Sequence, residues 1–117
     1  MDGNGEGLRH LNKREREIVR SFVRELREKL GDELVSVRLF GSKARGDFHP
    51  DSDIDIFVLV REKTPKVRSR LAEIAASYDV EYGLPLTPVL YDLFEHRKNT
   101  ELGSFFFESV EREGVAL

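Results

Sequence analysis

The sequence predicts an α+β domain in which a small mixed β-sheet is backed by helices. Two observations indicate this class. Segments with helical spacing and segments of branched apolar residues follow one another in the order helix, strand, strand, helix, strand, with short helical segments after the last strand. The chain has 117 residues, of which 39% are hydrophobic and 8 are Phe, enough for one modest core but not for a second large domain. We therefore expect residues 8–117 to form a single domain, preceded by a loose polar tail at residues 1–7.

The first element is an amphipathic helix, expected over residues 8–30. Apolar residues recur there at mostly helical spacing, and Gly31 is a suitable C-terminal stop. Glutamates are interleaved with the basic residues of this helix, so the pattern favours a solvated face with ion pairs over an RNA-binding face. The basic residues are Lys13, Arg14, Arg16, Arg20, Arg24 and Arg27.

Three strands are expected from runs of branched and aromatic residues. Residues 34–40 (LVSVRLF) alternate in part and lead into a Gly-Ser turn. Residues 53–60 (DIDIFVLV) are apolar apart from two acids, which is typical of a central strand with both faces covered. Residues 84–91 (LPLTPVLY) contain Pro85 and Pro88, and proline within a strand indicates an edge position.

Three further helices complete the expected elements. Thr64 and Pro65 are a good start for the first of them, which continues as an apolar stripe to Tyr78. Short helices are expected at residues 92–97 and 102–113. The last one contains three consecutive Phe residues, which cannot all face one core. At least one ring must meet another surface, either under the first helix or a terminal loop, or on a partner protein.

The composition excludes several classes of protein. Without cysteine, the chain has no disulfide scaffold, thiolate metal site or cysteine nucleophile. His10, His49 and His96 lie far apart in sequence and lack the spacing of a zinc motif. The formal net charge of −3 gives no general attraction to nucleic acid. No apolar run reaches membrane-spanning length or resembles a signal peptide, so we expect no membrane association and a cytoplasmic location.

The most informative segment spans residues 41–55. Asp53 and Asp55 open the second strand, and because strand side chains alternate, both project from the same face. Two neighbouring carboxylates repel each other unless a cation or a proton lies between them. Mg²⁺ suits such a pair, since it prefers oxygen ligands and is often held by only one or two carboxylates together with substrate phosphates.

The same segment begins with the features of a phosphate site. Gly41 and Ser42 follow the first strand, where glycine permits a close backbone approach and a following short helix would direct N–H groups at an anion. Lys43 and Arg45 lie beside them and can neutralise phosphate charge. Phosphate is therefore the expected occupant of this turn.

A P-loop is the main competing interpretation of the same residues. Residues 41–46 match the first half of that motif, but Asp47 and Phe48 follow in place of the Lys and the hydroxyl residue. Those two residues supply the γ-phosphate contact and the magnesium ligand of a P-loop, so this class is excluded.

Two short motifs in this segment resemble the signature of the DNA polymerase beta-like nucleotidyltransferase superfamily. They are Gly-Ser-x-Ala-Arg-Gly at residues 41–46 and Ser-Asp-Ile-Asp at residues 52–55. The resemblance is strongest to the minimal single-domain members, the MNT proteins, and it implies the nucleotidyltransferase fold. It implies that Asp53 and Asp55 are catalytic and bind up to two Mg²⁺ ions, and that an acceptor hydroxyl attacks the α-phosphate of ATP and releases pyrophosphate. The nucleotide-binding residues implied are Gly41, Ser42, Lys43, Arg45 and Ser52.

The resemblance also implies a third carboxylate on the strand after the intervening helix. The corresponding position holds Thr87 or Pro88 instead. Glu81 and Asp92 are nearby acids, and both are expected to be surface acids rather than ligands. Without a general base, nucleotide binding can persist while turnover slows.

Resemblance to this family also implies a partner. Minimal nucleotidyltransferases pair with HEPN-domain ribonucleases as toxin and antitoxin, so the chain would be an antitoxin that adds AMP to a tyrosine of a HEPN-domain toxin. The sequence does not decide whether the chain forms a homo-oligomer or a hetero-oligomer. Two alternatives also stay open: a catalytically weak or inactive module that neutralises its partner by contact, and a transferase acting on a small molecule of the aminoglycoside type.

Overall fold

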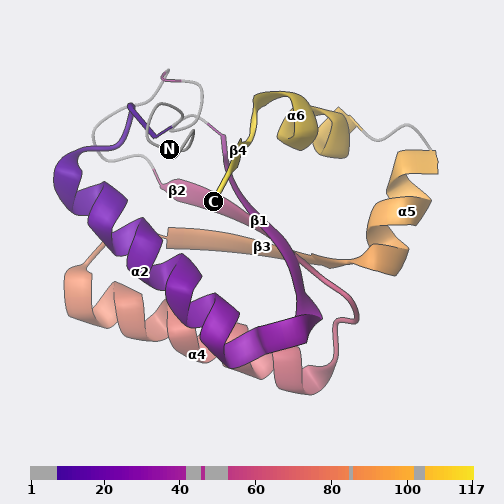
Figure 1. The fold of residues 1–117 in the computed structure, drawn as a ribbon, viewed down its shortest axis with the longest axis horizontal. Helices are drawn as coiled ribbons and strands as arrows, with labels where there is room; N and C mark the ends of the chain where they lie inside the picture. Colours follow the sequence, from indigo (N-terminus) through magenta and orange to yellow (C-terminus); the bar gives the residue numbers. More distant parts are fainter. Residues whose placement is uncertain (1–7, 42–45, 47–52, 85, 102–104) are drawn as a thin grey trace.

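A mixed sheet forms the centre of the computed structural model, which describes residues 8–41, 46, 53–84, 86–101 and 105–117. Within these residues the sheet has the strand order β3-β2-β1-β4, in which β1 runs antiparallel to β2 and β4, and β2 runs parallel to β3 (Figure 1). The predicted mixed sheet backed by helices is confirmed. The elements are α2 (Lys13–Leu30), η1 (Gly31–Glu33), β1 (Leu34–Phe40), β2 (Ile54–Val60), α4 (Pro65–Tyr82), β3 (Leu86–Asp92), α5 (Leu93–Glu101), α6 (Phe105–Glu113) and β4 (Val115–Ala116).

Strand β2 is the most deeply buried part of the sheet, as expected from its apolar sequence. It lies between β1 and β3, and six of its seven residues are buried. Alternate side chains face opposite sides, so that Ile54 and Ile56 enter the larger core while Phe57 and Leu59 enter a second cluster. Strand β3 lies at the edge of the sheet, which confirms the position predicted from its prolines.

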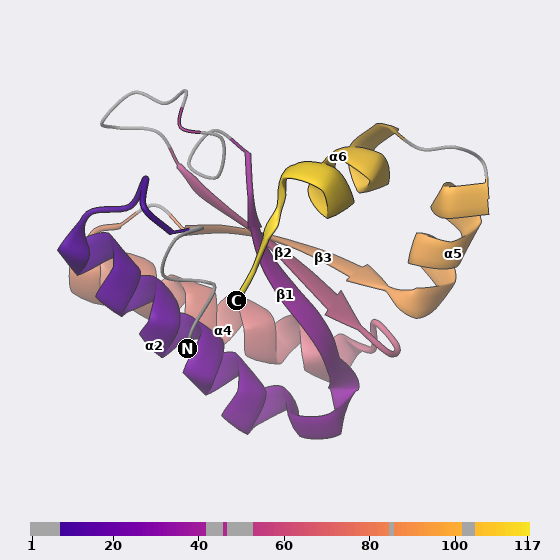
Figure 2. The same cartoon turned by 45° about the horizontal axis from the view of Figure 1, so that its top comes forward.

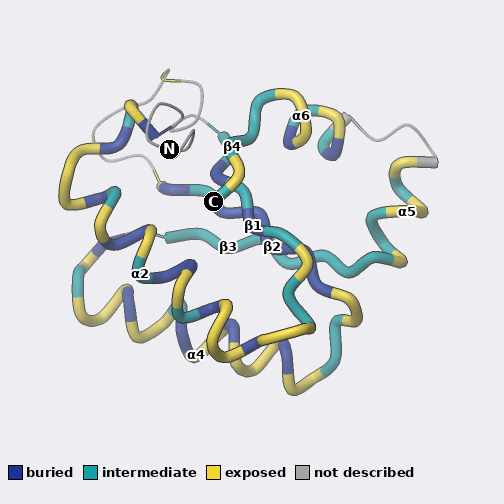
Figure 3. Tube along the Cα trace, viewed as in Figure 1, coloured by how far each residue is buried: buried dark blue, intermediate teal, exposed yellow. Residues whose placement is uncertain are grey.

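Helices α2 and α4 lie side by side on one face of the sheet (Figure 2). Their sheet-facing residues are buried and their outer residues exposed, the expected arrangement for amphipathic helices (Figure 3). At their contact, Phe22 and Tyr78 meet edge to face with ring centroids 5.4 Å apart, and the Tyr78 and Ser21 hydroxyls share a 2.7 Å hydrogen bond. Within the described residues, no helix combines the length and the apolar character needed to cross a bilayer.

Helix α2 begins at Lys13, five residues later than predicted. Leu8 and Leu11 are buried and fit the helical spacing, but they belong to a turn closed by a 3.0 Å hydrogen bond from Leu11 N to Leu8 O. The helix starts where Asn12 and Glu15 form a reciprocal capping box, which satisfies exposed backbone donors. The predicted end is confirmed, because Gly31 adopts φ 54° directly after Leu30.

The sequence predicts ion pairs on the basic face of α2. Two of its arginines, Arg14 and Arg27, instead form hydrogen bonds to main-chain carbonyl groups. Arg14 donates to the main-chain carbonyl of Tyr82, and Arg27 donates to that of Leu117, each at 2.6 Å. These side chains tie the helix to the end of α4 and to the residue after β4.

Helix α4 starts as predicted. Thr64 is its N-cap, accepting a 3.1 Å hydrogen bond from Val67 N, and Pro65 occupies the first turn. The helix ends at Tyr82 and is followed by Gly83, which adopts the left-handed conformation with φ 62°.

Helices α5 and α6 lie on the other side of the sheet from α2 and α4 (Figures 1 and 2). Here the rings of Phe57, Tyr91, Phe106 and Phe107 pack together with neighbouring centroids 4.9–6.1 Å apart; we call these four rings the aromatic cluster. One alternative predicted for the Phe run was burial under the first helix. This alternative is wrong for Phe106 and Phe107, because they pack on the opposite face of the sheet. The side chain of Phe105 lies outside the described residues.

Two differences from the predicted elements concern the C-terminal part of the chain. The predicted helix at residues 92–97 extends over Leu93–Glu101, and Asp92 is the last residue of β3. Strand β4, which was not predicted, pairs Val115 and Ala116 with β1. A two-residue strand is too short to show a periodic pattern, so the sequence carries no signal for it.

Candidate functional site

The carboxylate of Asp55 lies against Gly41, at the point where β1 ends beside the start of β2. Phe40 and Asp55 are paired across the antiparallel ladder. Gly41 has φ 78°, and a Cβ built on it would meet the Asp55 side chain, coming within 3.2 Å of Cγ. Only glycine therefore permits this approach of the bend to the acid.

Asp53 lies on the same side of the sheet as Asp55. It is exposed and directly precedes β2, and its Oδ2 accepts a 3.2 Å hydrogen bond from Thr87 Oγ1. Thr87 is the partner of Asp55 in the parallel ladder. The two acids and Thr87 thus share one end and one face of the sheet.

The structure distinguishes the two residues considered for the position of a third carboxylate. Thr87 pairs with Asp55 and reaches Asp53, whereas Pro88 pairs with Ile56, whose side chain enters the core beneath α2 and α4. Thr87 is therefore the residue beside the acids, and its hydroxyl is neutral.

Neither of the two nearby acids lies beside this pair. Asp92 pairs with Val60, five residues beyond Asp55, which corresponds to roughly 16 Å along the strand. Its carboxylate accepts hydrogen bonds from Glu95 N (2.8 Å) and Lys63 N (3.3 Å) and so caps α5. Glu81 is exposed on α4, which packs on the opposite face of the sheet.

Several residues predicted for nucleotide binding lie outside the described residues, namely Ser42, Lys43, Arg45 and Ser52. Between them, Gly46 is described, and it reveals a contact that sequence reasoning missed. A Cβ built on Gly46 would lie 2.6–3.0 Å from three atoms of the His10 imidazole, so the ring lies directly against this glycine. The sequence gives no signal for this contact, because 36 positions separate the two residues.

Next to the two acids, the same face of the sheet carries aromatic side chains. Phe57 follows Asp55 by two positions on β2, and Phe40 and Phe106 meet edge to face with centroids 5.6 Å apart. The acids therefore stand at the polar end of a sheet face whose next side chains are aromatic.

The donor set of the site fits a magnesium ion. Asp53 and Asp55 offer hard carboxylate oxygens on one face, and Mg²⁺ often takes only one or two carboxylates and completes its shell with water and phosphate. In the part of the chain that the structure describes, no group of three or more His, Cys, Asp or Glu side chains could hold a metal. The described residues therefore do not form a complete metal cage by themselves.

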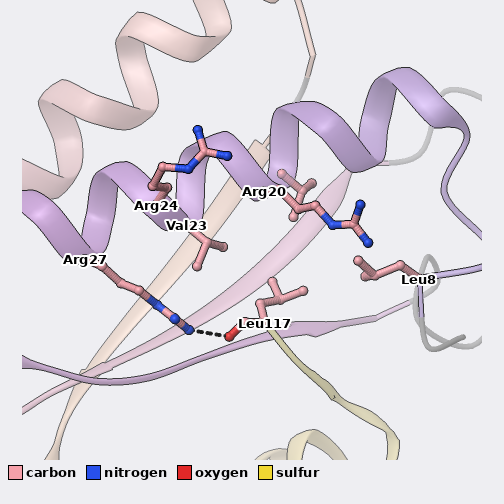
Figure 4. A pocket seen from close by; sticks show the side chains of 7 residues that line it. Leu8, Arg20, Val23, Arg24, Arg27 and Leu117 are labelled. Carbon is pink, nitrogen blue, oxygen red and sulfur yellow. Dashed lines mark hydrogen bonds between the residues drawn. The ribbon is translucent and has the colours of Figure 1, made fainter. Parts of the chain in front are cut away.

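A groove of about 360 Å³ lies elsewhere, between α2 and the end of the chain (Figure 4). Apolar side chains form part of it, and Arg27 donates across it to the Leu117 carbonyl. Among the described residues that line this groove, none has a carboxylate side chain, so they do not share the chemistry of the acidic pair. Its lining residues are Leu8, Val19, Arg20, Val23, Arg24, Arg27 and Leu117.

Comparison with known proteins identifies the family. The profile of the nucleotidyltransferase domain matches residues 19–112, most of the chain. The chain belongs to the nucleotidyltransferase domain family. This nucleotidyltransferase is 36% identical to "Putative protein adenylyltransferase MJ0141" of Methanocaldococcus jannaschii over 100 residues, covering 85% of the chain and 94% of that relative. It is 40% identical to MJ0604 of the same organism, which carries the same description, over 88% of the chain and 97% of that relative.

Solved structures show the same fold. A crystal structure of a toxin–antitoxin with AMP-PNP aligns with a TM-score of 0.54 at 23% identity, covering 82% of the nucleotidyltransferase and 69% of that chain. A variant of the toxin–antitoxin MntA-HpeT aligns with a TM-score of 0.52 at 26% identity, covering 84% and 70%. The resemblance to minimal nucleotidyltransferases is confirmed by these matches.

Proposed function

We propose that this nucleotidyltransferase transfers AMP from ATP to a hydroxyl group of a partner protein. The observation that carries the proposal is the pair of acids on one sheet face, with Asp55 held against the Gly41 bend. Two relatives that match almost over their full length carry the description "Putative protein adenylyltransferase", which supports a protein as the acceptor.

The reaction follows from the chemistry of the proposed ligands. The acceptor oxygen forms a bond to the α-phosphorus, the bond from that phosphorus to the bridging oxygen breaks, pyrophosphate leaves, and the hydroxyl proton passes to water. Asp53 and Asp55 would hold Mg²⁺, which when bound stabilises the negative charge of the phosphoryl oxygens. Ser42, Lys43, Arg45 and Ser52 are the proposed phosphate contacts.

The proposed partner is a HEPN-domain toxin, with this chain as its antitoxin. The support is the fold shared with chains of solved toxin–antitoxin structures, one of them the MntA-HpeT variant. Modification of the toxin by AMP would neutralise it. A cytoplasmic location is proposed with this role.

One observation favours a second function, neutralisation by contact alone. Thr87 stands beside the acids and its hydroxyl cannot serve as a carboxylate base. A site with two acids can bind nucleotide and still turn over slowly, in which case the partner would be inhibited without being modified.

The test is transfer of labelled AMP to the partner. Incubation with [α-³²P]ATP, Mg²⁺ and the proposed HEPN-domain partner should label that partner, and Asp53→Asn and Asp55→Asn should each lower the rate at least about a hundredfold. Asp79→Asn, the same change at an exposed position of α4, is the matched control and should retain activity.

The other outcomes separate the alternatives. Neutralisation that survives both Asn variants, with no label on the partner, would establish the contact mechanism. Label on an added aminoglycoside and not on protein would instead establish a small-molecule acceptor.

A further inference from the structure

We propose that Thr87 is a positioning residue of this site, whose hydroxyl orients the Asp53 carboxylate for metal binding. The inference rests on the proposed function, because it assumes that Asp53 is a metal ligand. It assigns a role at the site to Thr87, which lies outside both motifs, residues 41–46 and 52–55.

The two acids differ in how the fold holds them. Asp55 lies within β2, is paired on both sides, with Phe40 and with Thr87, and lies against Gly41. Asp53 precedes the strand and is exposed, so the ladder does not fix its side chain. A hydrogen bond therefore has a larger effect on the orientation of the Asp53 carboxylate than on that of Asp55.

Thr87 is well placed to provide that hydrogen bond. It lies in β3, and β-branched side chains have few χ1 rotamers, so its hydroxyl has few directions open to it. It donates to Oδ2 of Asp53 at 3.2 Å, which leaves Oδ1 and a second lone pair of Oδ2 for a cation. Partners that orient metal ligands in this way commonly change metal affinity about 10- to 100-fold when they are removed.

The neutrality of the hydroxyl has its own consequence. A carboxylate at this position would add a third negative charge beside Asp53 and Asp55, and would repel a triphosphate whenever no metal is bound. Thr87 orients the acid without adding charge.

The experiment compares Thr87→Val, which keeps the shape and removes the hydroxyl, with Thr87→Ser, which keeps the hydroxyl. Mn²⁺ binding is measured by calorimetry in the presence of adenosine 5′-(α,β-methylene)triphosphate, which cannot be cleaved between the α- and β-phosphates. We expect the Val variant to bind Mn²⁺ about tenfold more weakly and the Ser variant to stay within about twofold of the parent protein. Thr100→Val, on the exposed side of α5, is the matched control.

The outcomes distinguish this inference from the proposed function. Equal Mn²⁺ affinity in the parent, Val and Ser proteins, all with unchanged thermal unfolding, overturns the role of Thr87 and leaves the proposed function intact. Equal weakening in Val and Ser would assign the effect to packing and also overturn it. A parent protein that binds no Mn²⁺ with the nucleotide would overturn the proposed function and the inference together.

Discussion

Gly41 has no room for a side chain, because a Cβ at this position would meet the Asp55 side chain. We expect Gly41→Ala to abolish activity, because the new Cβ would displace the Asp55 carboxylate and because φ 78° is strained for alanine. Gly83→Ala is the control: it meets the same kind of strain at φ 62°, but no atom lies within 4 Å of the added Cβ.

The comparison of the two alanine variants separates backbone strain from damage to the site. Both should lose about 1 kcal/mol of stability in urea unfolding, with a further loss only in Gly41→Ala. AMP transfer should persist in Gly83→Ala. If Gly41→Ala kept full activity, the close approach of the bend to Asp55 would have no functional role.

The contact between α2 and α4 depends on a buried tyrosine whose ionisation affects stability. Burial raises the pKa of Tyr78 above its usual 10.0, and the nearby Glu25 carboxylate acts in the same direction. The unfolded chain therefore loses this proton first as the pH rises. The contribution of Tyr78 is fully present below pH 10 and is lost as the pH rises from there towards the higher folded pKa.

We expect Tyr78→Phe to be less stable than the parent protein at pH 7 and less sensitive to alkali. Loss of the 2.7 Å hydrogen bond to Ser21 should lower the free energy of unfolding by about 1 kcal/mol. Between pH 9 and pH 11, the difference from the parent protein should shrink in urea titrations. A constant difference over this range would show that Tyr78 does not titrate with folding.

The elements were predictable from sequence to the extent that a local pattern specified them. The apolar run of β2, the Thr64-Pro65 start of α4 and the Gly31 stop of α2 each have a local physical cause, and the structure has all three. The start of α2 was wrong because apolar spacing continued into a turn, and the cap at Asn12 decided the boundary. Strand β4 is too short to show a local pattern, and its partner β1 is far away in sequence.

The same limit applies to the site. Alternation along one strand predicted that Asp53 and Asp55 share a face, since that is a local property. The contacts of Thr87 with Asp53 and of His10 with Gly46 join residues that are far apart in sequence. Their proximity depends on the whole fold, so no local pattern predicts it. Sequence reasoning narrowed the third position to two neighbouring residues, and only the parallel register of β2 and β3 decided between Thr87 and Pro88.

At the scale of the whole molecule, the sheet separates two cores of unequal size. Within the described residues, the larger lies under α2 and α4, and the smaller is built by the aromatic cluster with Leu59 and Val110 under α5 and α6. Because the smaller core has few buried side chains, its layer is expected to open before the rest of the fold. The acids stand on the face that this layer covers only in part.

We expect Phe107→Ala to loosen this layer selectively. Phe107 is 4% exposed and contacts Phe57, Tyr91 and His96, so its truncation should cost about 3 kcal/mol. Phe94→Ala, at a ring that is 66% exposed on α5, is the control and should be nearly neutral. Hydrogen exchange should quicken in α5 and α6 of Phe107→Ala while α2, α4 and β2 stay protected. Uniformly faster exchange would mean instead that the two cores unfold as one cooperative unit, because then no layer opens on its own.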